Sequence, residues 1–482
     1  MVLKIDWQAR LGLHGKGFMQ QETVKSVVLA GLSGGSGKSV VSVGLIGALA
    51  KRGRGVVPFK KGPDYIDAGW LGKAAGRPCY NLDPYLMTPE TMVTTFQSHL
   101  QDCSFAVIEG NRGLYDGVSV AGEYSTAELA LLLDLPVLLV VNCAKTTRTV
   151  AALVLGCQAF DPRLRFAGVI LNQIATARHE SIVRQSVERY TDLPVLGVMP
   201  RLHRDIFPMR HLGVTPHQEY AAADEAVAAL AAAVEAHVDL DAACAAMRPV
   251  LPLPPQPRPV RVRADEVTIG VFRDAAFQFY YEENLEGLRA AGARLVPIDA
   301  LHSETLPADL DALYIGGGFP ETSAGELAAN TTFRASVRAR IEAGLPVYAE
   351  CGGLIFLGRS ILLEGREFPL AGVFPVTFSL ARKPQAHGYS ICTVEQANSF
   401  YPVGTTIRGH EFRYSVVHDW QGDSGELVLA MERGTGFADK RDGLVHKNVL
   451  ALYTHVLASA TPEWASGLLA AARRHAARRQ AA

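Results

Sequence analysis

Two short stretches of the sequence combine residues that can do chemistry. The first, "AGLSGGSGKSVVSVG", follows a β-branched run and is rich in glycine up to Lys38 and Ser39. The second, "PVYAECGGLIFLGRS", places Cys351 between an acidic residue and two glycines, directly after a short strand-like run. The first pattern predicts a loop that binds phosphate, and the second predicts a nucleophile at a strand-to-helix turn.

The glycine-rich loop has the residues needed to hold a nucleoside triphosphate. Backbone N–H groups freed by glycine can surround phosphate oxygens, and the following helix N-terminus favours anions. Five residues separate Gly31 from Gly37, one more than in the usual loop, a spacing shared with carboxylate-activating enzymes that resemble dethiobiotin synthetase. The predicted ATP ligands are Gly34, Gly35, Ser36, Gly37, Lys38, Ser39 and Lys60.

Acidic residues follow two later strands of the same half. "FKKGPDYIDAGW" carries Asp64 and Asp67, and "VIEGNRGLYDG" carries Glu109 and Asp116. Single aspartates in such loops are often turn residues, but ligands of open α/β sheets bind beyond the carboxyl ends of strands, where both loops would meet the phosphate loop. Carboxylates beside a triphosphate imply Mg²⁺. The predicted metal ligands are Ser39, Asp64 and Glu109.

Cys351 is one of seven cysteines, and an isolated cysteine is usually a small buried hydrophobe. Its flanking residues favour a different interpretation, because a cysteine at a strand-to-helix turn presents its sulfur above the sheet. The helix N-terminus and a nearby imidazole would then favour the thiolate. The seven cysteines form no CxxC pair, so neither a zinc site nor a redox pair is expected, and a reducing cytoplasm fits best.

The elements around these motifs predict two α/β domains in a chain of 482 residues. Short β-branched runs alternate with Ala/Leu-rich stretches, which is typical of a parallel sheet, and the last such stretch predicts one helix from Tyr220 to Met247. The proline-rich "RPVLPLPPQPRPVRVR" then favours an extended spacer, and a second α/β series follows. We therefore expect an extension over 1–24, an ATP-binding domain over 25–247, a linker over 248–264 and a second domain over 265–482, ending in a helix over Glu463–Arg479.

The amino-acid composition limits the kinds of partner that the protein is expected to bind. The chain is 48% hydrophobic, and its 47 basic and 48 acidic residues leave no net charge that would attract nucleic acid or a membrane surface. No stretch reaches about 18 uninterrupted apolar residues, so no membrane span is expected. The predicted partner is a small molecule.

Ordered sequence blocks add a family resemblance over nearly the whole chain. "FKKGPDYID", "GRPCYNLDPYLM", "EGNRGLYDG" and "RHLGV" resemble the cobyrinate a,c-diamide synthase family, which amidates acetate side chains of a tetrapyrrole precursor of cobalamin. "DALYIGGGFPE", "AECGGLIFL", "GHEFRYS" and "YTHV" are similar to its class I glutamine amidotransferase domain. The resemblance implies a P-loop NTPase-like parallel-sheet domain followed by a flavodoxin-like α/β amidotransferase domain.

The resemblance also implies roles for individual residues. Cys351 would attack glutamine, His455 would act as base and acid, and backbone N–H groups of Gly352 and of Gly317 or Gly318 would stabilise the oxyanion. Many class I relatives place an acid two residues after the histidine, where this chain has Leu457, so no third triad member can be named. Glu411 is interpreted as structural or interdomain. The implied substrate-handling residues are Asp64, Tyr65, Asp67 and Asp116.

Together the two halves predict an amide synthase that uses ATP, Mg²⁺ and glutamine, with cobyrinic acid as the expected substrate. Lys61, Asn111 and Arg112 depart from the family pattern, which leaves sirohaem and nickel sirohydrochlorin open as substrates. Cobyric acid synthase is a more distant alternative. A ParA-like ATPase switch and an inactive regulatory amidotransferase are the alternatives from other classes. The resemblance leaves a homodimer open as the assembly.

Overall fold

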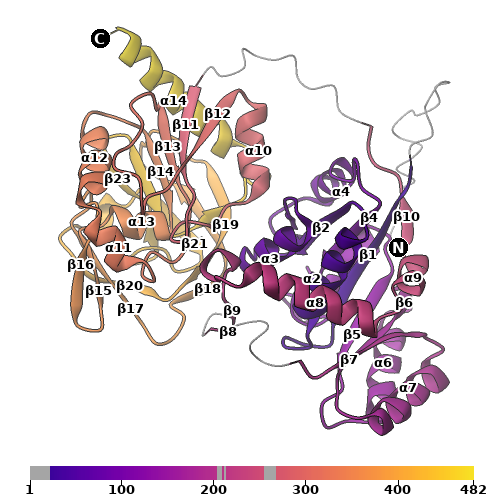
Figure 1. Ribbon diagram of the computed structural model, residues 1–482. Coiled ribbons are helices and arrows are strands. Elements are labelled where there is room, and N and C mark those ends of the chain that lie inside the picture. Colours follow the sequence, from indigo (N-terminus) through magenta and orange to yellow (C-terminus); the bar gives the residue numbers. More distant parts are fainter. Residues whose placement is uncertain (1–21, 203–208, 211–212, 255–266, 482) are drawn as a thin grey trace, which may run out of the picture.

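The computed structural model describes residues 22–202, 209–210, 213–254 and 267–481. Two α/β domains lie side by side, the first coloured indigo to magenta and the second orange to yellow (Figure 1). The first strand begins at Val24, one residue inside the predicted extension, whose first 21 residues lie outside the described part. Within the described residues, no helix is both long and apolar enough to cross a membrane.

The N-terminal domain is built on one sheet in the order β3-β2-β4-β1-β5-β6-β7, with β10 paired antiparallel to β1. The other seven strands are parallel, and β1 and β2 are buried on both faces, as parallel strands between helical layers must be. The strands are β1 (Val24–Gly31), β2 (Val56–Lys61), β3 (Tyr80–Leu82), β4 (Phe105–Glu109), β5 (Val137–Asn142), β6 (Phe166–Ile174), β7 (Val195–Pro200) and β10 (Arg248–Val250).

Helices cover both faces of this sheet, so the alternating side chains of each strand enter two separate cores. Val28 packs into one core with α4, α5, α6 and α7, while Val27 packs into the other with α2, α3, α8 and α9. The helices are α2 (Lys38–Lys51), α3 (Ile66–Ala75), α4 (Pro89–Ser98), α5 (Thr126–Leu132), α6 (Thr149–Phe160), α7 (Ala177–Thr191), α8 (Ala223–His237) and α9 (Leu240–Ala246). Short elements between β7 and α8 are β8 (Met209–Arg210), β9 (Gly213–Val214) and η2 (His217–Glu219).

The C-terminal domain has a second sheet in the order β12-β11-β13-β14-β24-β23, parallel except for β23. Helices α10 and α14 pack on one face, and α11, α12 and α13 pack on the other. The strands are β11 (Val267–Phe272), β12 (Ala293–Ile298), β13 (Ala312–Ile315), β14 (Val347–Glu350), β23 (Leu444–His446) and β24 (Val449–Leu452). The helices are α10 (Glu282–Ala290), α11 (Ala324–Ala329), α12 (Thr331–Glu342), α13 (Gly352–Leu357) and α14 (Glu463–Ala481).

Two smaller sheets complete this domain, in the orders β16-β15-β17-β20 and β22-β21-β18-β19-β25. The second of them carries His410 on β19 and His455 on β25, which are directly paired. The strands are β15 (Ser360–Leu363), β16 (Arg366–Pro369), β17 (Val376–Leu380), β18 (Ala386–Val394), β19 (Thr406–Arg413), β20 (Ser415–Trp420), β21 (Leu429–Arg433), β22 (Arg441–Asp442) and β25 (His455–Val456), and η3 (Ser424–Glu426) precedes β21.

The two domains are joined by polar and aromatic contacts around β3. Tyr281 and Leu457 of the second domain are buried against the apolar core of the first. The ring of Tyr389 stacks on that of Tyr85, with centroids 4.0 Å apart. The hydrogen bonds across the boundary include Tyr80 Oη to Glu286 Oε1 (2.8 Å), Asn81 N to Glu283 Oε1 (2.7 Å), Tyr389 Oη to Asp83 Oδ2 (3.1 Å) and Arg433 Nη1 to Tyr85 Oη (3.0 Å).

The fold class and the terminal helix are as predicted, while the start of the linker and one helix differ from the prediction. The first three residues of the expected linker form β10, because their backbone pairs with the start of β1. The single helix expected between Tyr220 and Met247 is wrong. It breaks at Val238, which is extended, and the side chain of Asp239 then caps α9 by accepting from Ala242 N.

Candidate active site

The phosphate loop connects β1 to α2, as predicted. Gly37, the N-cap residue just before α2, has φ 93°, a left-handed conformation that favours glycine. A Cβ at Gly37 would lie 1.9 Å from Nδ2 of Asn172, which donates a hydrogen bond to Ser36 O at 3.0 Å. Glycine is therefore required where β6 touches the loop. Sequence reasoning missed Asn172, since only the fold brings β6 to this position.

Lys38 ties the phosphate loop to the loop after β4. Its Nζ donates to Ser33 O at 3.1 Å and to Arg112 O at 2.6 Å. Burial lowers the pKa of Lys38, and the neighbouring charge of Lys60 lowers it further. A phosphate oxygen would offer these donors a better acceptor than a carbonyl does. The geometry supports Lys38 as a phosphate ligand.

Lys60 is the centre of a buried charge cluster. Its Nζ lies 2.6 Å from both Asp67 Oδ2 and Glu109 Oε1. Burial alone would lower the pKa of Lys60, but the two carboxylates outweigh it and raise that pKa. Lys60, predicted to lie beside phosphate, is thus held by carboxylates in this structure.

Two of the three predicted metal ligands meet beside this cluster. Ser39 Oγ donates to Glu109 Oε1 at 3.2 Å, and Glu109 Oε2 is buried with no hydrogen-bond partner among the described residues. An unpartnered buried carboxylate oxygen next to a hydroxyl suits Mg²⁺, which uses one or two carboxylates together with phosphates and water. The structure therefore fits the ion, although the described part of the chain holds no cluster of three His, Cys, Asp or Glu side chains for a metal.

The remaining predicted substrate residues lie toward the second domain. Asp64 accepts from Asp67 N at 2.9 Å, and burial raises its pKa to about 6. Asp116 accepts from Gly113 N at 2.8 Å. Tyr65 reaches the second domain, since its ring stacks on that of Phe279 with centroids 5.2 Å apart. The loop after β2 thus carries ATP-side residues and also touches the amidotransferase domain.

Cys351 occupies the sharp turn predicted from its neighbours. Strand β14 ends at Glu350 and α13 starts at Gly352, so the cysteine alone makes the turn, with φ 43° and ψ −94°. This strained backbone is rare for a residue with a side chain and is typical of functional positions. The cysteine is only 6% exposed and lies within the core beneath the turn.

His455 begins β25 and faces Cys351. Burial would lower the pKa of His455, but its interactions with Cys351 and then Glu350 outweigh burial and raise that pKa to about 10. The imidazole beside the sulfur is placed to exchange a proton with the thiol, whose deprotonated form is the nucleophile. The structure brings together the two residues that the sequence predicted as a catalytic pair.

Three glycines crowd this centre. A Cβ at Gly317 would lie 2.3 Å from His455 Cε1, and a Cβ at Gly352 would lie 2.9 Å from Gly318 N. Only glycine allows the backbone and the imidazole to approach this closely. Gly318 N therefore lies at the nucleophile turn, in agreement with the predicted oxyanion role of these glycines, which remains a prediction.

A carboxylate reaches His455 from a position that sequence reasoning missed. Glu350, which immediately precedes Cys351, is fully buried and places Oε2 3.7 Å from His455 Nδ1. The only signal in the sequence was the acidic residue in "AECGG", which is adjacent to the cysteine rather than near the histidine.

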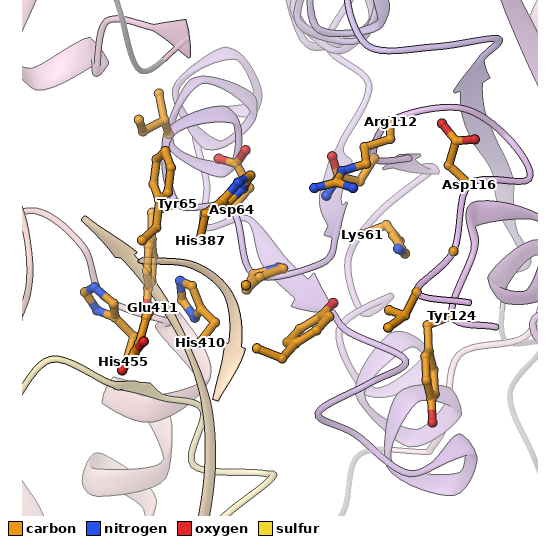
Figure 2. Close-up of a pocket in the computed structure, with 18 of the residues that line it drawn as sticks. Lys61, Asp64, Tyr65, Arg112, Asp116, Tyr124, His387, His410, Glu411 and His455 are labelled. Carbon is orange, nitrogen blue, oxygen red and sulfur yellow. The ribbon is translucent and has the colours of Figure 1, made fainter. Parts of the chain in front are cut away.

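One cavity of about 580 Å³ lies between the domains and is lined by residues of both candidate centres. Figure 2 shows His455, His410 and Glu411 on one side of it and Lys61, Arg112 and Asp116 on the other. Tyr65 stands beside the histidines, with its ring centroid 5.4 Å from that of His455. A second cavity of similar size lies on the other side of Tyr65, along α3.

The acidic side chains that line the first cavity have hydrogen-bond partners, whereas its cationic side chains have no ion-pair partner among the described residues. Its acidic groups accept backbone N–H bonds; Glu411, for example, accepts from Thr435 N and Gly436 N at 2.8 Å each. Its cationic residues Lys61, Arg112 and Arg433 form no ion pair with any described residue. An anionic ligand with several carboxylates would satisfy these donors.

Comparisons with known proteins agree with both domains. A CobQ/CobB/MinD/ParA nucleotide binding domain matches residues 27–212, and a CobB/CobQ-like glutamine amidotransferase domain matches residues 268–463. A cobyrinate a,c-diamide synthase of Magnetococcus marinus is 41% identical over 437 residues, which cover 89% of this chain and 93% of that protein. The chain belongs to the cobyrinate a,c-diamide synthase family.

Other members of the cobyrinate a,c-diamide synthase family are similar over the same span. The synthase of Dehalococcoides mccartyi is 37% identical over 92% of this chain and 97% of its own. That of Archaeoglobus fulgidus is 38% identical over 90% of this chain and 94% of its own. The nucleotide-binding and amidotransferase domains of this family member fit ATP and glutamine as substrates.

Proposed function

We propose that this protein converts cobyrinic acid to its a,c-diamide, with ATP as the activating reagent and glutamine as the nitrogen source. The relatives named above carry that activity in their names, and both required domains are present. The observation that carries the proposal is the shared cavity, because His455 and the substrate loop of the ATP domain line one space. Ammonia released at one centre can therefore reach a carboxylate bound at the other.

Glutamine cleavage uses the residues around the turn. The Cys351 thiolate attacks the side-chain amide carbon of glutamine, and His455 protonates the departing ammonia. Water then hydrolyses the thioester and releases glutamate. Backbone N–H groups at Gly318 and Gly352 stabilise the oxyanion of each tetrahedral intermediate, at roughly 3 kcal/mol per donor.

Activation of the carboxylate uses the residues around the phosphate loop. A ring carboxylate attacks the γ-phosphorus of ATP, ADP leaves, and ammonia then displaces phosphate from the acyl phosphate to form the amide. Lys38 positions and neutralises the phosphates. Mg²⁺, held by Ser39 and Glu109, would neutralise phosphate charge when bound.

The cations of the cavity hold the remaining carboxylates of the ring. Lys60 and Lys61 are successive residues of β2, whose side chains point to opposite faces of the sheet. Lys60 is bound by two carboxylates, whereas Lys61 lines the cavity, where it is 6% exposed. Lys61 therefore offers a partly desolvated cation to the ligand, and Arg112 lies on the same side of the cavity (Figure 2).

The experiment that tests the proposal supplies ATP, Mg²⁺ and amide-¹⁵N glutamine with cobyrinic acid, sirohaem or nickel sirohydrochlorin in separate reactions. We expect a product with two labelled amides from cobyrinic acid. A labelled product from another ring alone would reassign the substrate, and no labelled amide from any of the three would overturn the proposal.

A substitution links that activity to the cavity. Lys61→Met should raise the KM for cobyrinic acid about tenfold or more, because one charge-assisted contact is lost, with the KM values for ATP and glutamine unchanged. Lys25→Met is the matched control, since Lys25 is exposed at the opposite end of β1. An unchanged KM for the ring in Lys61→Met would remove Lys61 from the binding site.

A further inference from the structure

The acid that usually follows the catalytic histidine is replaced here by Leu457, which is fully buried in an apolar core. His455 nevertheless has a carboxylate beside it. Glu350 Oε2 lies 3.7 Å from Nδ1, and both side chains are almost completely buried. Among the described residues, this buried Nδ1 forms no hydrogen bond.

We propose that Glu350 is the positioning residue of the glutaminase centre, holding His455 through Nδ1 so that the opposite ring nitrogen faces Cys351. The proposal rests on the glutaminase role of these residues given above. The acid thus comes from the residue before the nucleophile, at the end of β14, rather than from the strand that carries the histidine.

The strained turn explains how adjacent residues serve opposite sides of one imidazole. Glu350 still belongs to the strand, where its side chain contacts β25, while Cys351 has left the strand with φ 43°. Two further contacts fix the carboxylate: Val456 N donates to Oε1 and Tyr314 Oη donates to Oε2, each at 3.3 Å. Glu350 is therefore pre-oriented, and a small tightening on substrate binding would close the gap to Nδ1.

The other groups around His455 supply no competing charge. His410 of β19 stacks on it with centroids 5.0 Å apart, and burial lowers the pKa of His410 well below the usual value, so it stays neutral. Tyr65 of the ATP domain also contacts the ring, and burial raises the pKa of its phenol. Glu411 of β19 lies on the same side of the cavity, but its carboxylate accepts from Thr435 N and Gly436 N. Besides Cys351, Glu350 is thus the anionic group that raises the pKa of His455.

The test compares Glu350→Gln with wild type by glutamate release across pH. Loss of the acid should lower kcat for glutamine at least ~100-fold. It should also move the alkaline limb of the pH profile to lower pH by about one unit or more, because the imidazolium loses a neighbouring anion. Amide formation from ammonium salts reports folding, and it should stay near the wild-type rate. Tyr314→Phe is the matched control, since it removes a different bond to the same carboxylate and should leave the alkaline limb in place.

Glu350→Asp keeps the charge on a shorter side chain, so it should release glutamate slowly with an alkaline limb near that of wild type. If Glu350→Gln does not fold, glutamate release by Glu350→Asp tests the proposal instead. Unchanged glutamate release in either folded variant would overturn the proposal, and so would equal losses with glutamine and ammonium. If wild type itself releases no glutamate from glutamine, the proposed function fails instead.

Discussion

Gly317→Ala should silence the glutaminase while sparing the synthetase. The new Cβ would lie 2.3 Å from His455 Cε1, whereas carbon atoms in contact are normally 3.5–4.0 Å apart. The imidazole must therefore retreat by more than ~1 Å. His410 stacks on the same ring and Tyr65 packs against it, so retreat displaces both.

The size of the effect follows from that displacement. A catalytic group misplaced by ~1 Å costs about 100-fold in rate, so glutamate release should fall about 100-fold. Overpacking should also cost about 1–3 kcal/mol of stability. Gly317 is not among the glycines with positive φ, so its backbone conformation does not itself exclude alanine.

The assay compares glutamate release with amide formation from ammonium chloride in the same preparation. The ammonium-dependent rate should stay within about twofold of wild type, because the variant lies outside the ATP site. Gly287→Ala on α10 is the control, since a Cβ there meets no atom within 4 Å, and both rates should be unchanged. A folded Gly317→Ala variant with wild-type glutamate release would refute the reasoning.

Three further outcomes are expected. Lys38→Met should lower amide formation at least ~100-fold with either nitrogen donor while glutamate release persists; retention of ammonium-dependent synthesis would contradict the assigned role. Tyr65→Ala should raise the ratio of glutamate released to amide formed above one, because the aromatic ring beside His455 is lost. An unchanged ratio would contradict this prediction. Burial raises the pKa of Asp442 to about 7, so between about pH 4 and 7 the unfolded chain loses a proton that the native protein keeps, and stability falls as pH rises. Urea unfolding of Asp442→Asn should show a flatter decline, by about 4 kcal/mol over that range, and an unchanged slope would disprove this.

The phosphate loop and the nucleophile turn could be predicted because their chemistry is local. Glycines, Lys38 and Ser39 act within one strand-loop-helix unit, and the same holds for Cys351 and its flanking glycines. The two-domain α/β fold could also be predicted, since most strands of the two parallel sheets are short apolar runs that alternate with helical stretches. Residues that act through the backbone of their own segment are therefore visible in the sequence.

Residues that act across the fold could not be predicted. Asn172 supports the phosphate loop only because β6 ends beside it. Glu350 reaches His455 only because β25 lies against the end of β14. The broken helix at Asp239 is a different failure, since an alanine-rich run favoured helix on both sides and one capping residue decided the break.

The proposed function requires that ammonia made at Cys351 reach the activated ring carboxylate through the interdomain cavity, without release to solvent. Isotope competition tests this most directly, with amide-¹⁵N glutamine supplied together with excess unlabelled ammonium and the label in the diamide measured by mass. We predict that both amide nitrogens come almost entirely from glutamine. A label content equal to that of the mixed ammonia in solution would contradict a shared cavity that joins the two centres.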